Sequence, residues 1–360
     1  MNSIELCNVT KRYGRGPIIL DDVSLAVQPN ELVTVLGASG SGKTTLLMIV
    51  AGFEEPSAGT VFVKGRASNG IPPQKRNLGV VFQNYALFPY LSVWQNVEFP
   101  LKVRGVASHE RRALVSKILE VVGLAERAQS RPHQLSGGQQ QRAALARALV
   151  FEPAALLLDE PLSALDRRLR ESLQSEIKEV QQRTGASILY VTHDQDEALR
   201  LSDRIAVIAH GRIAQVGTPH DIYRNPVSLF VAGCLGEINA LTCTPLEKNS
   251  SIVRVRYATG EGRARRPADT NSEHAAAGVV AVRPDDLYFC GDADAAENRI
   301  QGVVQEIAFL GSAVRYRIAV GSDDVVVRRP AADAALHDAA PGRAVMLAFR
   351  EENATFFSLS

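Results

Sequence analysis

The sequence predicts two domains, an α/β domain with a mostly helical insertion and then a small all-β domain. Strand-like and helical segments alternate over the first 235 residues, as in a β/α core. A glycine-rich loop follows one of these strands and opens a helix. After about residue 235, apolar residues alternate with polar ones, which is typical of half-buried strands. A chain of 360 residues also fits two domains better than one.

The α/β domain is assigned to residues 1–235 from the order of its expected elements. Apolar residues at helical spacing, such as Ile118, Leu119 and Val122, predict a helical subdomain over residues 84–150. A short helix is expected to begin near Pro219. The expected strands are residues 4–9, 23–27, 31–36, 61–63, 78–82, 155–158, 188–191 and 205–208, with a helix over residues 44–51.

The all-β domain is assigned to residues 236–360. Apolar and polar residues alternate along Val253–Tyr257, Val314–Val320 and Val345–Phe349, so each segment is expected to be a strand. Thr259–Gly278 is rich in Gly, Arg and Ala, and we expect it to be an exposed loop.

Composition excludes several classes of function. Lys and Arg number 40 and Asp and Glu 39, so the net charge of +1 argues against nucleic-acid binding through bulk charge. The 4 cysteines are scattered with no C-x-x-C pair, which predicts a reduced intracellular protein without a zinc or dithiol site. No secretory signal opens the chain, and no apolar run approaches the roughly 18 residues of a spanning helix.

A phosphate-binding loop is predicted between the strand that ends at Leu36 and the helix that follows. Glycines let backbone N–H groups wrap around a phosphate, and the helix N-terminus adds its positive dipole end. Lys43 would reach the outer phosphates, and Thr44 would offer a hydroxyl to Mg²⁺. Thr45 either helps to hold a phosphate or only packs the helix start. The matching residues are Gly37, Ala38, Ser39, Gly40, Ser41, Gly42, Lys43 and Thr44.

Two carboxylates follow the apolar run Ala155–Leu158, which suits a central parallel strand. At the carboxyl end of such a strand, Asp159 would hold Mg²⁺ through water and Glu160 would activate the attacking water as general base. A strand that ends in a solvated acidic turn is the alternative. His193 follows another apolar run and is a candidate γ-phosphate contact, and Gln83 is a candidate Mg²⁺ and water ligand.

The segment Leu135-Ser136-Gly137-Gly138-Gln139 identifies the family. With the phosphate loop, the Asp-Glu strand and the later histidine in this order, residues 1–235 resemble the ATP-binding subunits of ABC transporters. This segment, the signature, opens a helical run, so Ser136, Gly137 and Gly138 can form a second anion cradle. A helix cap alone would explain Ser136 but not the glycines and Gln139. The signature also speaks against a P-loop kinase or GTPase.

The resemblance implies a head-to-tail homodimer with ATP between the phosphate loop of one chain and the signature of the other. It implies that Tyr13 stacks on adenine and that Gln83 senses the γ-phosphate and Mg²⁺. It further implies that Ser163–Asp166, including Asp166, couples the two sites. Asn84–Val97 would dock a helix of the transmembrane permease subunits.

The last third of the chain resembles the TOBE module, an OB-like β-barrel, at Val282–Asp286 and Gly302–Gly311. This module follows the ATPase in bacterial importers, which also use a periplasmic substrate-binding protein. The resemblance therefore implies a peripheral subunit on the cytoplasmic face of the inner membrane. OB-like barrels often bind nucleic acid, but no aromatic platform or basic groove is evident, so no nucleic-acid partner is expected.

The imported substrate is predicted only from local similarity. Ile71–Arg76, Val81–Pro89 and Leu235–Asn239 most resemble importers of polyamines, spermidine and putrescine. Iron(III), 2-aminoethylphosphonate, sulfate and sugar importers are the alternatives. An exporter subunit, or an ABC ATPase of DNA repair or translation, is a further alternative, although the TOBE-like tail favours import.

Overall fold

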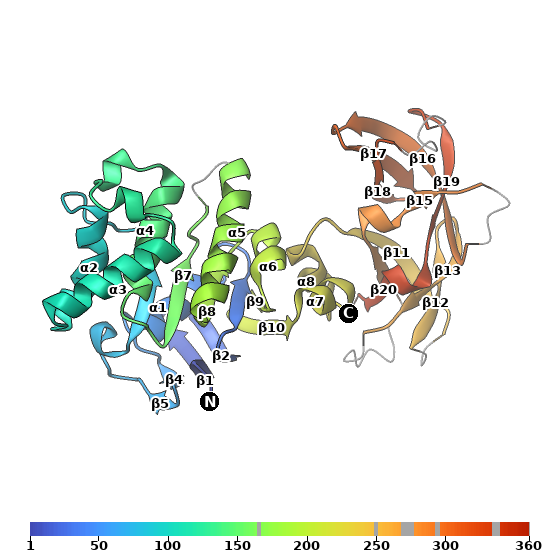
Figure 1. Cartoon of the computed structure of the whole chain (residues 1–360). Helices are drawn as coiled ribbons and strands as arrows, with labels where there is room; N and C mark the ends of the chain where they lie inside the picture. The colour runs from blue at the N-terminus through green and yellow to red at the C-terminus, as the bar shows by residue number, and fades with distance from the viewer. Residues whose placement is uncertain (164–166, 248–250, 268–276, 292–295, 333–338, 360) are drawn as a thin grey trace. The chain divides into compact units, whose positions relative to one another are not determined.

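The computed structural model describes residues 1–163, 167–247, 251–267, 277–291, 296–332 and 339–359. These residues form two compact units, Met1–Pro219 and His220–Ser360 (Figure 1). Residues 220–235, which the sequence analysis placed in the first domain, belong to the second unit.

A six-stranded sheet forms the centre of the first unit, in the order β10-β9-β3-β8-β7-β6. The strands from β9 to β6 run parallel, and β10 pairs antiparallel at the edge. The carboxyl ends of the parallel strands therefore lie along one edge of the sheet. The six strands, in sheet order, are β10 (Arg212–Gly217), β9 (Arg204–Ala209), β3 (Leu32–Leu36), β8 (Ile188–Thr192), β7 (Ala155–Asp159) and β6 (Leu78–Val81).

A four-stranded antiparallel sheet covers one side of α1 (Lys43–Ala51), and the central sheet lies on the other side. Along β7, Ala155 and Leu157 face the core around α1, whereas Leu156 and Leu158 face the core of the helical subdomain. This alternation buries both faces of the strand and explains its continuous apolar run. The antiparallel strands are β2 (Ile18–Val27), β1 (Ile4–Arg12), β4 (Ala58–Val63) and β5 (Arg66–Ala67), in sheet order.

The helical subdomain consists of α2 (Val93–Val103), α3 (Ser108–Val121) and α4 (Gly137–Leu149), which lie together in Figure 1. Capping boxes start two of these helices, Ser92 with Gln95 and Ser136 with Gln139. This part of the predicted architecture is confirmed. The unit also contains α5 (Arg167–Thr184), α6 (Gln195–Leu201) and single turns at Pro73–Lys75, Ala125–Arg127 and Pro132–Gln134.

The second unit is an all-β domain preceded by two short helices, α7 (Pro219–Arg224) and α8 (Leu229–Cys234). A closed barrel in the order β11-β12-β13-β20-β14 shares one core with a sheet in the order β15-β19-β16-β17-β18. The barrel strands are β11 (Asn239–Pro245), β12 (Ile252–Tyr257), β13 (Gly260–Arg265), β20 (Ala354–Ser358) and β14 (Gly278–Val282). The sheet strands are β15 (Tyr288–Phe289), β19 (Ala344–Phe349), β16 (Asn298–Phe309), β17 (Ala313–Val320) and β18 (Asp323–Pro330). Single helical turns lie at Pro284–Asp286 and Glu351–Asn353.

One prediction for this domain is wrong, because residues 260–265 form β13 rather than a loop. The strand pairs with β12 over its whole length. Its inward positions are Gly262 and Ala264, so no large apolar residue marks it as a strand. A Cβ at Gly262 would lie 2.0 Å from Asn298 Oδ1, which explains why the position is glycine. Residues 268–276 of the predicted loop lie outside the described residues.

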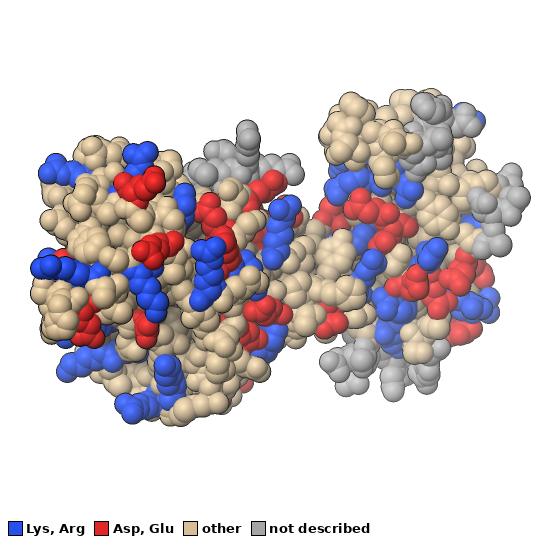
Figure 2. All heavy atoms as spheres, viewed as in Figure 1, with Lys and Arg blue, Asp and Glu red and all other residues tan. Residues whose placement is uncertain are grey.

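On the face viewed in Figure 2, basic and acidic side chains are interspersed over each unit. In the part of the chain that the structure describes, no helix is both long and apolar enough to cross a membrane. The same residues contain no group of three or more His, Cys, Asp or Glu side chains that could hold a metal ion.

Candidate active site

The phosphate loop arches from β3 to α1, and its glycines are required by geometry. Gly42 caps the helix with φ of 100°, a left-handed conformation that favours glycine. A Cβ at Gly37 would lie 2.6 Å from the backbone oxygen of Ile208 on the neighbouring strand. Ala38–Gly40 form the exposed tip of the loop. The loop can therefore present its backbone N–H groups to a phosphate.

Lys43 lies under this arch with its ammonium group held by the loop itself. Its Nζ donates to the backbone oxygens of Gly37, at 2.9 Å, and Ala38, at 2.8 Å. Burial lowers the pKa of Lys43, while the charges of Glu160 and Asp159 oppose that shift. The buried Ser41 Oγ has no hydrogen-bond partner among the described residues. The loop therefore encloses an ammonium group and a hydroxyl group without a partner, both next to the place proposed for the phosphates.

Asp159 ends β7 next to the start of α1. Its Oδ1 lies 3.5 Å from Thr44 Oγ1. Burial raises the pKa of Asp159, the Glu160 charge adds to the rise, and Thr44 and Lys43 oppose it. A hydroxyl and a carboxylate so close together are hard oxygen ligands, which suit Mg²⁺. The residues present therefore fit the predicted ion.

This raised pKa leads to a stability prediction. A carboxyl group whose folded pKa lies above its unfolded value, about 3.9, destabilises the fold as pH rises through that interval. Asp159→Asn should therefore be more stable than the wild type at pH 7 without nucleotide or metal, and each 1 kcal/mol gained would raise the melting temperature by about 2–4 °C. Melting curves of both proteins from pH 3 to pH 8 test this, since the difference should vanish below about pH 3.9. An equal or lower melting temperature at pH 7 would contradict it.

Glu160, His193 and Gln83 meet at the same edge of the sheet. His193 Nδ1 lies 3.1 Å from Glu160 Oε2. Gln83 Nε2 donates to Ser163 Oγ at 2.9 Å, and this hydroxyl donates to the Glu160 backbone oxygen at 3.0 Å. Glu160 has a φ of 44°, a strained value for a non-glycine residue that is typical of functional sites. Three predicted site residues from separate strands are therefore brought together.

A buried network behind His193 was not foreseen from the sequence. Glu197 accepts hydrogen bonds from Tyr190 Oη, at 2.8 Å, and Thr192 Oγ1, at 2.7 Å. Asp194 caps α6 and pairs with Arg170 of α5 at 2.7 Å. These contacts fix the β8–α6 turn that carries His193. Only the Asp194 cap has a sequence signal, because the other contacts depend on how α6 packs against β8 and how α5 packs against their turn.

Tyr13 lies in the turn before β2, where its ring is 48% exposed. The Lys11 ammonium lies 4.6 Å from the ring centroid. A Cβ at Gly42 would touch Ile19 of β2, so the turn before β2 lies beside the phosphate loop. The exposed ring is thus free to stack on a flat ligand near the phosphates.

The signature residues form the N-terminus of α4 and make their hydrogen bonds within that turn. Ser136 Oγ accepts from the Gln139 backbone N–H at 3.3 Å, and Gln139 Oε1 accepts from the Ser136 N–H at 3.0 Å. None of these bonds reaches the phosphate loop, so the described chain does not bring the two cradles together. Asp166 lies outside the described residues, and Thr45 is half-buried in the first turn of α1.

Comparison with known proteins identifies the family. The ABC transporter family model matches residues 20–163, and the TOBE domain model matches residues 280–357. The chain is 44% identical to the spermidine/putrescine import ATP-binding protein PotA of Thermobifida fusca over 98% of this chain and 92% of that protein. It is 41% identical to the Fe(3+) ions import ATP-binding protein FbpC 1 of Rhizobium meliloti over 97% and 96%.

The chain belongs to the ATP-binding proteins of the ABC transporter family. Among solved structures, this ABC ATPase resembles CbiO1 of Clostridium perfringens, part of an ABC transporter complex, with a TM-score of 0.57 and 28% identity over 62% of this chain and 90% of that one. It also resembles a dimeric ATP-binding cassette in a post-hydrolysis state bound to ADP and Pi. That match has a TM-score of 0.52 and 33% identity over 60% and 98%. The predicted fold class, TOBE domain and ATPase activity are confirmed.

Proposed function

We propose that this ABC ATPase powers the import of polyamines through a separate membrane permease. The observation that carries the proposal is the similarity to spermidine/putrescine import ATP-binding proteins along nearly the whole chain, including the Thermobifida fusca protein at 44% identity. A second such protein, from Acidothermus cellulolyticus, is 42% identical over 97% of this chain. The iron(III) import relative, at 41% identity, supports iron(III) as the second candidate substrate.

Each residue of the site has a proposed part in ATP hydrolysis. Lys43 and the loop N–H groups bind the phosphates, and Glu160 orients the attacking water and accepts its proton. His193, which lies 3.1 Å from Glu160, contacts the γ-phosphate. Thr44, Gln83 and Asp159 would hold Mg²⁺, which when bound neutralises charge on the phosphate oxygens.

Two chains are proposed to complete each site head to tail. Within one chain, the signature helix satisfies its own N-cap while its glycines leave the N-terminus open to an anion. A second chain would place this N-terminus against the γ-phosphate bound at the phosphate loop of the first. The dimeric structural neighbour bound to ADP and Pi supports this assembly. Asp166 is proposed to couple the two sites.

The surface proposed to dock the permease is Asn84–Val97. Tyr90 in this segment is 85% exposed, and the ring of Phe88 lies 4.7 Å from that of Phe99. Arg147 of α4 donates to the backbone oxygens of two left-handed residues, Tyr85 and Ala86, at 2.8 and 2.6 Å. The helical subdomain therefore fixes the shape of this segment. Exposed aromatics on a fixed loop suit a partner helix at the cytoplasmic face of the inner membrane.

Tyr13 is proposed to stack on adenine, which gives a binding prediction. Stacking a base on an aromatic ring contributes about 1–3 kcal/mol, so Tyr13→Ala should weaken ATP binding by about tenfold or more. Tyr13→Trp should keep the affinity, because it keeps an aromatic face. Calorimetric titration of both variants tests this, and equal affinities of Tyr13→Ala and the wild type would contradict stacking.

The substrate is tested with the complete transporter. The chain would be reconstituted in vesicles with its permease and its periplasmic substrate-binding protein, and ATP hydrolysis would be measured with each substrate. Spermidine or putrescine should stimulate hydrolysis, whereas iron(III), 2-aminoethylphosphonate, sulfate and sugars should not. Stimulation by iron(III) alone would overturn the polyamine proposal and favour the second candidate. A complex carrying Glu160→Gln controls for contaminating ATPases.

A further inference from the structure

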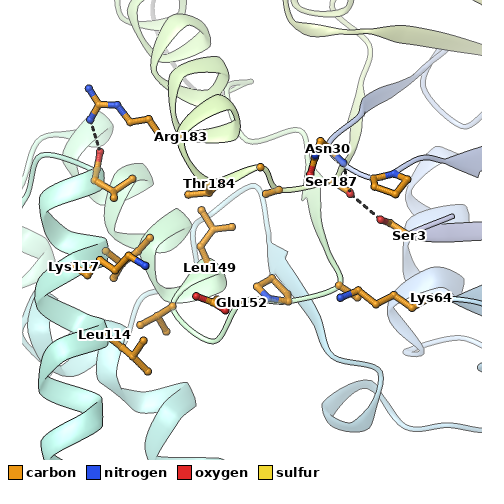
Figure 3. Close-up of a pocket in the computed structure, with 18 of the residues that line it drawn as sticks. Ser3, Asn30, Lys64, Leu114, Lys117, Leu149, Glu152, Arg183, Thr184 and Ser187 are labelled. Atoms are coloured by element: carbon orange, nitrogen blue, oxygen red, sulfur yellow. Dashed lines mark hydrogen bonds between the residues drawn. The ribbon is translucent and has the colours of Figure 1, made fainter. Parts of the chain in front are cut away.

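A cavity of about 630 Å³ opens between α3 and the amino ends of the central strands (Figure 3). Leu114, Ile118 and Val121 of α3 line one wall with apolar side chains. Ser3 and Ser187, whose hydroxyl groups share a hydrogen bond of 2.8 Å, line the other. The volume and mixed lining match those of small-molecule sites in proteins.

This cavity is separate from the ATP site. Ser187 directly precedes β8 and Ala154 directly precedes β7, whereas Asp159 and Thr192 end these strands. A five-residue strand spans about 16 Å at 3.3 Å per residue. The cavity therefore lies at the amino ends of these strands and the phosphate loop at their carboxyl ends. Both sites can be occupied at once.

Two ammonium groups point into the cavity from opposite walls. Figure 3 shows the side chain of Lys117 entering from α3 and that of Lys64 entering from the β4–β5 turn. Neither ammonium group forms an ion pair with another residue in the described ranges. Arg183 is turned toward the Val121 backbone oxygen, at 3.3 Å. Glu152 adds one carboxylate, so the charged side chains that face the cavity leave it positive.

Both Lys64 and Glu152 hold backbone conformations that these residue types disfavour. Lys64 has a φ of 45° and Glu152 a φ of 49°, in the left-handed region where glycine or asparagine is more stable. A turn that served only the fold would gain stability from either of those residues. Two ionisable residues that keep a strained backbone conformation beside one cavity indicate a binding function.

We propose that this cavity binds an amphipathic organic anion. Its apolar body lies against α3, and its carboxylate, sulfonate or phosphate group lies between Lys64 and Lys117. Glu152 accepts a hydrogen bond from a hydroxyl or amide group of the ligand. Because the ligand contacts α3 on one side and the strand ends on the other, it holds the helical subdomain against the sheet.

The test uses the full chain, with 8-anilinonaphthalene-1-sulfonate as the probe and excess ADP to fill the ATP site. The wild type should give saturable fluorescence. The double variant Lys64→Asn, Lys117→Gln should bind the probe at least about tenfold more weakly, a loss of about 1.4 kcal/mol. Lys75→Gln removes an exposed positive charge outside the cavity and should leave binding unchanged.

Stability controls keep the test decisive. Lys64→Asn suits the left-handed turn, so the melting temperature of the double variant should not fall. Leu114→Trp leaves the charges intact but fills the cavity, and it should also weaken binding. Wild-type affinity in both the double variant and Leu114→Trp would show that the probe is an adventitious additive that binds elsewhere on the chain. That result would overturn the proposal.

Discussion

Glu160→Gln should abolish steady-state ATP hydrolysis while leaving ATP binding intact. The amide keeps an oxygen beside His193, whose Nδ1 lies 3.1 Å from the carboxylate, but it cannot take a proton from water. General-base catalysis contributes about 10²–10⁴-fold, so the rate should fall by at least about 100-fold. The backbone strain at φ of 44° is the same for glutamine, and the melting temperature should therefore change little.

The measurement is ATP turnover beside ATP affinity for the wild type and Glu160→Gln. Glu120→Gln, which removes one exposed carboxylate from α3, is the matched control and should keep full turnover. The ATP-bound variant should also accumulate as a closed dimer. Hydrolysis by Glu160→Gln at a rate near that of the wild type would remove Glu160 from the role of base.

Ser136→Glu should block hydrolysis without weakening ATP binding by a single chain. In the proposed dimer, Ser136 faces the γ-phosphate held by the other chain, so a carboxylate there opposes a like charge. Such repulsion costs several kcal/mol, which corresponds to a loss of turnover of at least about 100-fold. ATP affinity should stay unchanged below the concentration at which chains pair, because the signature does not contact the phosphate loop of its own chain.

Ser92→Glu is the matched control for this variant. Ser92 and Ser136 are both N-caps within capping boxes, so each substitution changes a helix cap and adds one negative charge. Ser92 is buried and Ser136 is exposed, so without the permease Ser92→Glu should lower stability at least as much as Ser136→Glu and still keep its ATPase activity. An equal loss of turnover in both variants would assign the effect to helix capping and count against a shared site.

The strand-end residues show what the sequence could predict. Asp159 and Glu160 end an apolar run, and the open edge of a parallel sheet collects such residues from several strands. The phosphate loop was predictable because its glycines are required by the local backbone conformation, such as the φ of 100° at Gly42. The roles assigned to Tyr13, Ser136 and Asp166 came from family resemblance and stay predictions.

Other features depend on tertiary contacts that leave no local pattern. The pairs Gln83 with Ser163 and Arg170 with Asp194 join residues far apart in the chain. Strand β13 was missed because its inward positions are small, as the nearby Asn298 side chain requires. The packing of residues 220–235 with the second unit follows from contacts and not from composition.

Complementation between two inactive variants tests most directly the central claim that two chains share each ATP. Lys43→Ala removes the phosphate contact, and Ser136→Glu places a carboxylate where the signature should face the γ-phosphate. Neither homodimer therefore has a complete site. A mixed dimer has one, built from the Lys43 of one chain and the Ser136 of the other. The equimolar mixture should regain up to about a quarter of wild-type single-turnover hydrolysis, since half of the dimers are mixed and each has one complete site. A mixture no more active than either variant alone would contradict the shared site.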